Sequence, residues 1–480
     1  MINTIHKYDL IVIGAGSAGL SVGFFMQKAG FKILMISRKD EEIGGDCLND
    51  GCIPSKALIH VARTAYAAKT ASRFGLTVTG KVDIKKAMHY VYSRQEIIRE
   101  HEDAKALRKR GITVALGEAK FINKNQVEVA GEIYEANKIV IATGSLPIKL
   151  KIPGTELIKY YDNKSIFHID ELPDRLLIIG GGPIGIEMAQ AFTRLGSKVT
   201  VVDMLNRILL HDEESVVEIL YKKLQQEGIV FYLEAATESF SSPNEAVLKL
   251  KNGESATVSF DAVFVGIGRK LELDSLELKH AGIAVKDKNI VINKYLQTTN
   301  KNIFVCGDIA GDLMFSHAAE FHARILINNF FSPLKKKLNN DHMSWVTFTD
   351  PEVAHFGLSE KQLKERGIKY VKLQQDLSGD DRAITDDFQY GSIILFISKG
   401  NVFKKTKILG GTMVAPNAGE LIQELILANT SGLSIKSIFN KIYPYPVASR
   451  VNQHLIVKHK EKGLTPGLKK LLHLAFKIFS

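Results

Sequence analysis

The feature that most constrains the fold of this chain is a local pattern that occurs twice. In residues 8–37 an apolar run leads into the turn Gly14-Ala-Gly-Ser-Ala-Gly19, then a helical pattern and a second apolar run. The same order returns about 165 residues later, at Gly180-Gly-Gly-Pro-Ile-Gly185, and ends at Asp203. Strand, glycine turn, helix and strand are typical of a Rossmann-like fold. The sequence therefore predicts an α/β protein with two such folds.

Each glycine turn is also a candidate phosphate site. A glycine-rich turn at a helix start lets a pyrophosphate approach backbone N–H groups at the positive end of the helix dipole. The alternative, that the glycines serve only close packing of helix on strand, is weaker where two turns occur in the same context. The candidate positions are Gly14, Gly16 and Gly19 in the first fold and Gly180, Gly182 and Gly185 in the second.

The end of the second strand of each fold indicates which nucleotide binds. An acid there normally accepts hydrogen bonds from a ribose, and Asp203 meets this demand in the second fold. It favours NAD(H) over NADP(H), because a 2′-phosphate would face a carboxylate, although Arg207 could reverse the preference. The first fold has Ser37 at this position, which can bond a ribose hydroxyl more weakly, with Glu41 or Glu42 as alternative acceptors.

Outside the two glycine turns, apolar runs predict how the chain continues. The charged stretch Glu96–Arg110 predicts a helix, and residues 138–145 predict a strand that returns to the first sheet. Residues 302–311 predict another buried strand of that sheet. After a linker at Lys335–Asn340, alternating segments from Trp345 onward predict an antiparallel sheet with helices, an α+β domain.

A pair of cysteines carries the strongest chemical signal. Cys47 and Cys52 have a four-residue spacer, which lets the two sulfurs meet across one helical turn. A nearby positive charge or helix N-terminus lowers a thiol pKa and favours the reactive thiolate. Three cysteines cannot form the disulfide framework of a secreted protein, so this pair suggests redox catalysis. We expect Cys306 to be an inert buried thiol.

With these motifs, residues 7–455 resemble the class I pyridine nucleotide-disulfide oxidoreductases, which include dihydrolipoamide dehydrogenase, glutathione reductase and mercuric reductase. The resemblance implies that electrons pass from NAD(P)H through FAD to the cysteine pair. It makes Cys52 the charge-transfer thiol against the flavin and Cys47 the interchange thiol that faces substrate. It also places Lys56 near flavin N5, paired with Glu187, which keeps the lysine charged while negative charge develops on reduced flavin.

Other cofactor positions follow from the same resemblance. Thr143 and Gly144 match a segment near FAD, and Asp308 matches the acid that binds the ribityl chain. Gly268 and Arg269 match the strand on the nicotinamide side. The implied cofactors are FAD and NAD(H) in preference to NADP(H), and the sequence holds no zinc-ligand cluster, so no metal site is predicted.

The C-terminal part resembles the dimerisation domain of the family, closest to mercuric reductase-like members. This implies a homodimer in which the C-terminal segment of one subunit completes the disulfide site of the other. The implied domains are residues 1–150 for the first part of the FAD-binding domain, 151–270 for the NAD(P)-binding domain, 271–338 for the return to the FAD and central domain, 339–455 for dimerisation and 456–480 for a basic amphipathic tail.

The segment expected to complete the site departs from the family pattern. Dihydrolipoamide dehydrogenase and glutathione reductase have a His there, oriented by a Glu, whereas this chain has Tyr445 and Arg450. A phenol with a pKa of about 10 cannot replace imidazole at neutral pH without a large shift. Mercuric reductase carries Tyr but also needs a C-terminal cysteine pair, and no cysteine follows Cys306. Tyr445 stays a candidate catalytic residue.

The predicted function is therefore a flavoprotein oxidoreductase, similar to mercuric reductase without its C-terminal cysteine pair, that reduces a small-molecule electron acceptor. The acceptor stays open between a disulfide, a metal ion and a quinone. One alternative is dihydrolipoamide dehydrogenase itself, which Tyr445 opposes. Another is a catalytically impaired flavin-binding regulatory protein, which Ser37 and Arg450 favour.

The charge of the chain is concentrated at its C-terminal end. Of a net charge of +11, residues 458–480 contribute six Lys against one Glu. No nucleic-acid motif accompanies this charge, so we expect no nucleic-acid partner. With no signal peptide or spanning segment in the sequence, we expect a cytoplasmic protein.

Residues 464–480 offer a possible exception to a purely cytoplasmic location. We expect them either to dock on the protein's own dimer or to contact the inner face of an anionic membrane weakly. The stripe that would make this contact consists of Leu468, Leu471, Leu472, Ala475, Ile478 and Phe479.

Overall fold

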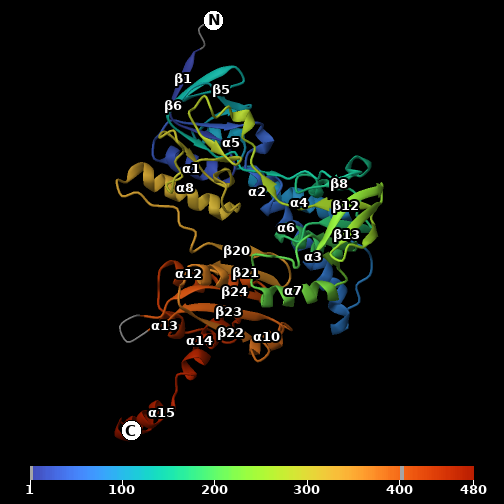
Figure 1. Cartoon of the computed structure of the whole chain (residues 1–480), viewed down its shortest axis with the longest axis vertical. Coiled ribbons are helices and arrows are strands. Elements are labelled where there is room, and N and C mark those ends of the chain that lie inside the picture. Colours follow the sequence, from blue (N-terminus) through green and yellow to red (C-terminus); the bar gives the residue numbers. More distant parts are fainter. Residues whose placement is uncertain (1–3, 401–404, 480) are drawn as a thin grey trace. The chain divides into compact units, whose positions relative to one another are not determined.

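The computed structural model describes residues 4–400 and 405–479 (Figure 1). The chain forms two compact units. The first comprises the chain up to Asn206 together with Ile229–Asn339, and the second comprises Arg207–Gly228 together with the chain from Asn340 onward.

The first glycine turn belongs to a seven-stranded sheet of the first unit. Its central strand β1 pairs in parallel with β2 and β6, and β19 pairs in parallel with β6. These central strands are apolar and buried between layers of structure, as parallel strands usually are. The predicted strands within 138–145 and 302–311 are confirmed. The strands are β1 (Ile5–Ile13), β2 (Ile33–Ser37), β3 (Thr113–Leu116), β4 (Ala119–Phe121), β5 (Gln126–Val129), β6 (Glu132–Ile141) and β19 (Ile303–Val305).

The second glycine turn belongs to a five-stranded parallel sheet in the same unit, in the order β11-β10-β9-β15-β8. A three-stranded antiparallel sheet, β12 (Ala235–Ser242), β13 (Glu245–Leu250) and β14 (Ser255–Ser259), accompanies it. The prediction of two Rossmann-like folds is confirmed. The strands of the larger sheet are β8 (Tyr160–Tyr161), β9 (Arg175–Ile179), β10 (Lys198–Asp203), β11 (Val230–Leu233) and β15 (Ala262–Val265).

Four helices of the first unit position the site. Helix α1 (Ser17–Lys28) follows β1, α6 (Pro183–Leu195) follows β9, α3 (Cys52–Thr70) begins at a cysteine and α8 (Ser316–Phe331) follows β19. Helices α1 and α8 lie side by side, and α3 packs against α6 (Figure 1). This packing brings segments from both ends of the unit next to the cysteine loop.

The helix predicted at Glu96–Arg110 is interrupted. The structure has α4 (Ile84–Arg99) and α5 (Ala104–Lys109) with a break at residues 100–103. The side chain of Asp103 accepts the Ala106 N–H at 2.6 Å and so caps the start of α5. A continuous helix is therefore wrong here, because an Asp that can cap a helix competes with helix continuation.

The second unit has an antiparallel sheet in the order β20-β21-β24-β23-β22, which confirms the predicted α+β domain. Helix α7 (Glu214–Gln226) also belongs to this unit. Just before α7, Asp212 accepts a hydrogen bond from Trp345 Nε1 at 2.9 Å. The strands are β20 (Ser344–Thr347), β21 (Glu352–Gly357), β22 (Tyr370–Asp376), β23 (Ser392–Ser398) and β24 (Ile408–Ala415). The remaining helices are α9 (Glu360–Glu365), α10 (Asp381–Thr385), α11 (Ala418–Leu421), α12 (Gln423–Thr430), α13 (Ile435–Phe439), α14 (Val451–Glu461) and α15 (Pro466–Phe479).

Candidate functional site

The first glycine of each turn is required by close backbone approach. Gly14 has φ +109°, and a Cβ there would lie 2.2 Å from the carbonyl oxygen of Ala142. Gly180 has φ +116°, and its Cβ would lie 2.4 Å from the carbonyl oxygen of Gly266. The third glycine lets the helix lie close to the strand end, since a Cβ on Gly19 or Gly185 would lie within 2.0 Å of the first glycine's carbonyl oxygen.

The second glycine of each turn faces open space. Gly16 and Gly182 are the N-caps of α1 and α6, and neither cap makes a side-chain hydrogen bond. A Cβ on Gly182 would meet no heavy atom within 4 Å, and one on Gly16 would only approach the Cα of Gly45 at 3.5 Å. Neither helix has an acid in its first turn. An uncapped, positive helix start with room for a ligand fits a pyrophosphate.

The strand-end residues differ between the two folds. The carboxylate of Asp203 accepts N–H groups from Gly181 at 2.5 Å and Leu205 at 2.7 Å, which fixes it beside the second glycine turn. Ser37 is only 6% exposed, and its hydroxyl donates to the carbonyl oxygen of Lys39 at 2.9 Å. The hydroxyl oxygen of Ser37 retains acceptor capacity, whereas Asp203 offers a charged acceptor.

Two of the nearby charged side chains, Arg207 and Glu42, have partners within the protein. The guanidinium of Arg207 donates to the carbonyl oxygens of Leu210 at 2.6 Å and Asp212 at 3.0 Å. Glu42 forms an ion pair with Arg38 at 2.8 Å. These contacts occupy Arg207 and Glu42 with partners of the protein itself.

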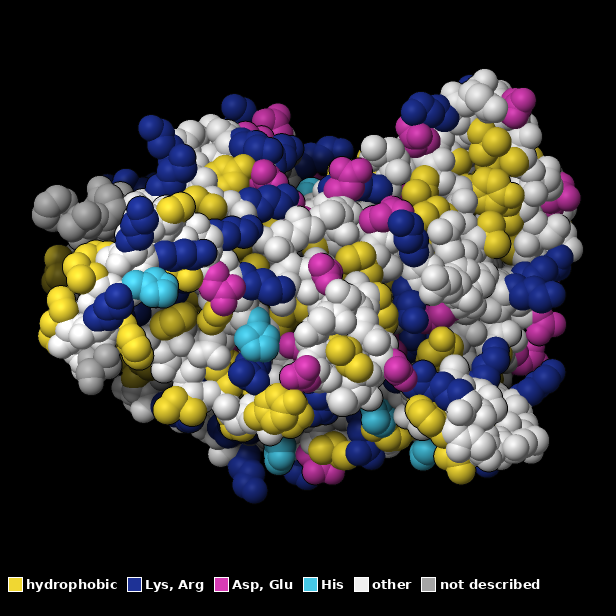
Figure 2. All heavy atoms as spheres, turned by 90° about the horizontal axis from the view of Figure 1, so that it is seen from below, with side chains coloured by type: hydrophobic (Ala, Val, Ile, Leu, Met, Phe, Trp, Pro, Cys, Tyr) yellow, Lys and Arg dark blue, Asp and Glu magenta, His cyan; other side chains and the backbone are white. Residues whose placement is uncertain are grey.

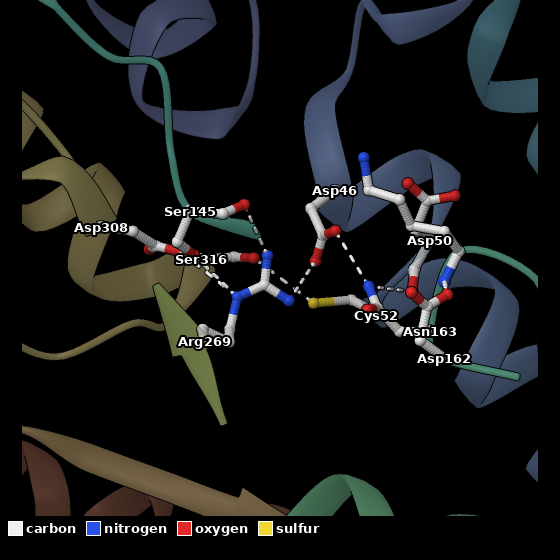
Figure 3. A network of polar contacts seen from close by, with 10 residues as sticks. Asp46, Asp50, Cys52, Ser145, Asp162, Asn163, Arg269, Asp308 and Ser316 are labelled. Atoms are coloured by element: carbon white, nitrogen blue, oxygen red, sulfur yellow. Dashed lines mark hydrogen bonds and ion pairs between the residues drawn. The ribbon is translucent and has the colours of Figure 1, made fainter. Parts of the chain in front are cut away.

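The two cysteines lie in two consecutive helices. Cys47 lies in α2 (Gly45–Asn49) and Cys52 is the first residue of α3. All three cysteines, including the fully buried Cys306, are free thiols in the structure. The sulfur of Cys52 lies 3.3 Å from the hydroxyl oxygen of Ser316, at the start of α8 (Figure 3). The structure thus joins the cysteine loop to a residue 264 positions away.

The two thiols are polarised in opposite directions. A hydrogen bond from Cys47 lowers the pKa of Cys52 to about 6, aided by Ser316 and by the charge of Lys56, while burial opposes the shift. The same hydrogen bond, together with burial, raises the pKa of Cys47 far above its ordinary value. In the reduced pair the negative charge therefore resides on Cys52 and the proton on Cys47.

Lys56 lies one helical turn after Cys52 on α3. Its ammonium contacts a carboxylate oxygen of Glu187, on α6, at 2.8 Å, so the predicted pair is present. Glu187 is 5% exposed, whereas Lys56 is about a third exposed. A buried carboxylate needs a charge partner, and α3 packing on α6 supplies it.

Arg269 connects the cysteine loop with the segment after β6 (Figure 3). It follows Gly268, whose φ is +113°, and its guanidinium donates to Ser145 Oγ at 2.7 Å and to the Ser145 carbonyl oxygen at 3.0 Å. The same group lies 3.2 Å from Asp46 and 3.9 Å from Asp308. Arg269 is thus surrounded by two carboxylates and a hydroxyl.

The segments near the FAD positions also meet at this place. Thr143 and Gly144 lie just beyond the end of β6, and Asp308 follows β19, its parallel neighbour. Ser145 Oγ donates to Asp308 at 2.6 Å. Burial raises the pKa of Asp308, and the contacts with Ser145 and Arg269 oppose that shift. Parallel pairing of β6 and β19 therefore places these predicted residues at one sheet edge.

Four further residues were not predicted from the sequence. Besides Ser316, Ser145 and Asp46, they include Asn163, whose amide donates to Asp46 Oδ1 at 3.0 Å and to the Asp50 carbonyl oxygen at 3.2 Å. Asp46 and Asp50 lie on either side of Cys47 in the sequence. These two acids close to the cysteines were the sequence signal that could have pointed to a polar network here. Burial and the charge of Asp46 raise the pKa of Asp50 to about 7.

Tyr445 lies in the second unit, whereas the cysteine pair lies in the first. Its side chain is exposed, its hydroxyl donates to Asp381 at 3.2 Å, and the guanidinium of Arg450 lies 5.5 Å from its ring centre. On α14, His454 lies 3.7 Å from Asp380. Burial and the charge of Arg450 lower the pKa of His454.

This geometry agrees with comparison to known proteins. Residues 8–323 match the pyridine nucleotide-disulphide oxidoreductases, and residues 343–455 match the dimerisation domain of that family. The chain belongs to this family. It is an NAD(P)H-dependent flavoprotein disulfide oxidoreductase with FAD and a pyridine nucleotide as cofactors, and its dimerisation domain supports a homodimer.

Similar proteins in this family differ in their substrates. A mercuric reductase of Lysinibacillus sphaericus is 32% identical over 92% of this chain and 80% of its own length. A dihydrolipoyl dehydrogenase of Mycoplasma pneumoniae is 32% identical over 93% of this chain and 97% of its own. The Cu(II) complex of the HOCl-induced flavoprotein disulfide reductase RclA from Escherichia coli is 26% identical, with a TM-score of 0.80, and covers 94% of this chain and 99% of its own.

Proposed function

We propose that this oxidoreductase passes electrons from NADH through FAD to the Cys47–Cys52 pair, and from there to a thiophilic metal ion. The observation that carries the proposal is the opposite polarisation of the two thiols beside the Lys56–Glu187 pair. When bound, FAD accepts hydride from the nicotinamide and delivers two electrons to the disulfide.

The FAD site is proposed at the first glycine turn. The uncapped start of α1 receives the pyrophosphate, and the hydroxyl of Ser37 accepts a weak hydrogen bond from the ribose. Asp308 serves the ribityl chain, since it is buried at the edge where β6 and β19 end. The residues assigned to FAD are Gly14, Gly16, Gly19, Ser37, Lys56, Thr143, Gly144 and Asp308.

The nicotinamide nucleotide is proposed to bind at the second glycine turn. Asp203 accepts from the ribose and disfavours a 2′-phosphate, and the contacts of Arg207 with carbonyl oxygens support NADH over NADPH. Arg269 is assigned to the nicotinamide side, where its contact with Asp46 also holds the cysteine loop. The residues assigned are Gly180, Gly182, Gly185, Asp203, Gly268 and Arg269.

The chain's own thiols carry out the final transfer. Two electrons break the Cys47–Cys52 bond and leave a Cys52 thiolate and, with one proton taken up, a Cys47 thiol. Lys56, held by Glu187, stabilises negative charge nearby. Two Cu(II) ions then take one electron each, the Cys47 proton is released and the disulfide forms again. For Hg(II), one ion takes both electrons.

A metal acceptor is favoured because a reduced metal ion can leave without being protonated, whereas a product thiolate must take up a proton. Tyr445 and Arg450 replace the His–Glu pair that thiol products require, and Tyr445 is proposed to contribute its hydroxyl to the acceptor site of a second subunit. Similarity to a mercuric reductase and to RclA, whose structure was solved as a Cu(II) complex, supports this class. A thiolate is a preferred ligand of soft ions such as Hg(II) and the Cu(I) product.

The alternative is dihydrolipoamide dehydrogenase, which an identity of 32% over nearly the whole chain supports. A steady-state screen of the purified enzyme decides between them, with NADH or NADPH as donor and Cu(II), Hg(II), lipoamide, glutathione disulfide and a quinone as acceptors. Fast turnover with a metal ion and slow turnover with both disulfides supports the proposal. Lipoamide turnover as fast as flavin reduction contradicts it, and absence of flavin bleaching by NADH favours a regulatory protein.

A further inference from the structure

The C-terminal helix α15 has an apolar surface that the protein core does not use. Of its residues from Pro466 to Phe479, Ala475 is partly exposed and the others are exposed. Phe479 is 87% exposed and Leu471 is 61% exposed. Exposing large apolar side chains along a whole helix is unfavourable in water, so this surface indicates a binding partner.

The two faces of α15 separate apolar from cationic residues. At about 100° per residue, the apolar side chains cover a little over half of the helix circumference. The opposite face holds Lys469, Lys470, His473 and Lys477, and the helix contains no Asp or Glu. The apolar face consists of Leu468, Leu471, Leu472, Leu474, Ala475, Phe476, Ile478 and Phe479. A broad apolar face beside a lysine-rich one without acids is typical of helices that lie in a membrane interface.

A basic groove lies in the same unit, and part of its lining, Lys460, Lys462 and Gly463, comes shortly before α15 in the sequence. Its volume is about 660 Å³, and its lining holds the three lysines Lys436, Lys460 and Lys462. None of its lining residues is Asp or Glu. Figure 2 shows Lys and Arg side chains together with hydrophobic and acidic ones on the face that it draws. Such a groove is complementary to phosphate groups.

From these observations we propose that α15 binds the surface of a bilayer that contains anionic lipid, with the basic groove contacting lipid phosphates. The charge of the helix and of the groove selects this occupant over a neutral apolar protein groove, because lysines near an anionic leaflet gain attraction that a neutral surface lacks. The inference goes beyond the proposed electron transfer and does not depend on it. No helix within residues 4–400 and 405–479 is long and apolar enough to cross a membrane, so the binding is peripheral.

Co-sedimentation of the full-length, FAD-loaded protein with vesicles tests the proposal. We expect binding to vesicles of equal parts phosphatidylcholine and phosphatidylglycerol, and little binding to phosphatidylcholine alone. The double variant Leu471→Ser with Ile478→Ser should bind about tenfold more weakly, because it removes apolar contact with the acyl region. Neutralising one lysine should weaken binding about fivefold, which corresponds to about 1 kcal/mol, so Lys469→Glu with Lys470→Glu should weaken it more than about twentyfold.

A matched pair of lysines gives the control. Lys85→Glu with Lys86→Glu reverses two exposed charges at the start of α4 and should leave vesicle binding unchanged. Deletion of residues 464–480 should abolish binding while flavin absorbance and the rate of flavin reduction by NADH stay at parental values, which shows that the variant is folded.

Three outcomes would overturn the proposal. The first is that the intact protein does not sediment with anionic vesicles. The second is equal binding to vesicles with and without phosphatidylglycerol. The third is that the deletion changes the dimer mass in light scattering but not vesicle binding, which would assign α15 to a second copy of the chain.

Discussion

At the scale of single residues, the chemistry of this protein depends on unequal sharing of one proton. Cys47 and Cys52 are chemically identical side chains, yet the first retains its proton and the second loses it at neutral pH. The difference arises mainly from the hydrogen bond between the two thiols, which lowers the pKa of Cys52 and raises that of Cys47, and the charge of Lys56 lowers the pKa of Cys52 further. A cysteine at a helix N-terminus beside a lysine is expected to be a thiolate.

This polarisation predicts a spectroscopic signature. One equivalent of NADH should give a two-electron-reduced enzyme with long-wavelength charge-transfer absorbance, because the Cys52 thiolate donates to oxidised flavin. The pKa of Cys52 is lowered to about 6, so the band should be full at neutral pH and disappear as the pH falls through about 6. Anaerobic titration in an absorbance spectrometer measures both.

Two serine variants form the control for that signature. Cys52→Ser should lack the band, whereas Cys47→Ser should show it without any reductant, because its Cys52 thiolate is always free. Parental spectra in both variants would contradict the disulfide relay.

At the scale of elements, the site depends on contacts between segments that approach one another at strand ends. Within one glycine turn, the positions differ in backbone conformation and in the space available for a side chain. Gly180 lies against the Gly266 carbonyl oxygen with a positive φ, whereas Gly182 has room for a Cβ and a φ of −75°. The first position serves the fold and the second serves the ligand.

We therefore expect alanine to act differently at these two glycines. Gly182→Ala should leave the thermal midpoint near that of the parent and raise KM for NADH about tenfold, since a methyl group enters the pyrophosphate space. Gly180→Ala should destabilise the protein by about 2 kcal/mol or more, because alanine strains a positive φ and the methyl group clashes with backbone. Thermal melts and steady-state kinetics of both variants measure the difference, and equal stability would contradict it.

The contacts of Arg269 join three elements and allow a second test. Arg269→Met leaves Asp46 and Asp308 without their cationic neighbour, and we expect a loss of about 2–3 kcal/mol, since the Arg269 side chain is only 14% exposed. Arg366→Met is the matched control, because the Arg366–Asp341 pair is 44% and 35% exposed and should contribute less than about 1 kcal/mol. Urea unfolding followed by flavin fluorescence compares the two, and equal losses would contradict the role of Arg269.

At the scale of the whole molecule, the candidate site residues belong to two different units. The cysteine pair and both glycine turns belong to the first unit, whereas Tyr445, Arg450 and His454 belong to the second. The dimerisation domain supports a homodimer, and we propose that the second unit of one subunit completes the cysteine site of the other. The identity of the acceptor is then decided by the second unit.

This division predicts that the two half-reactions respond differently to mutation. Flavin reduction by NADH should be fast, while turnover with lipoamide or glutathione disulfide should be slow, because general acid–base help is typically worth about a hundred- to ten-thousand-fold. Tyr445→His with Arg450→Glu should raise disulfide turnover at least about tenfold and leave flavin reduction unchanged. Stopped-flow and steady-state rates measure the two steps.

Rapid disulfide turnover by the parent would contradict this argument and indicate another base. His454→Gln is then the informative variant, because His454 faces Asp380 at 3.7 Å. Its loss should slow disulfide turnover without changing flavin reduction.

The sequence by itself determined the two Rossmann-like folds, the cysteine pair and the Lys56–Glu187 pairing, since these features follow from local patterns and from a family motif. It did not reveal the break before α5, where capping by Asp103 competes with helix continuation. Nor did it reveal Ser316 beside Cys52 or Ser145 beside Arg269, which are 264 and 124 positions apart. Only the tertiary structure decided these contacts. Packing of α8 on α1 brings Ser316 to the cysteine loop, and antiparallel pairing of β16 (Arg269–Lys270) with β7 (Leu146–Pro147) brings Arg269 beside Ser145.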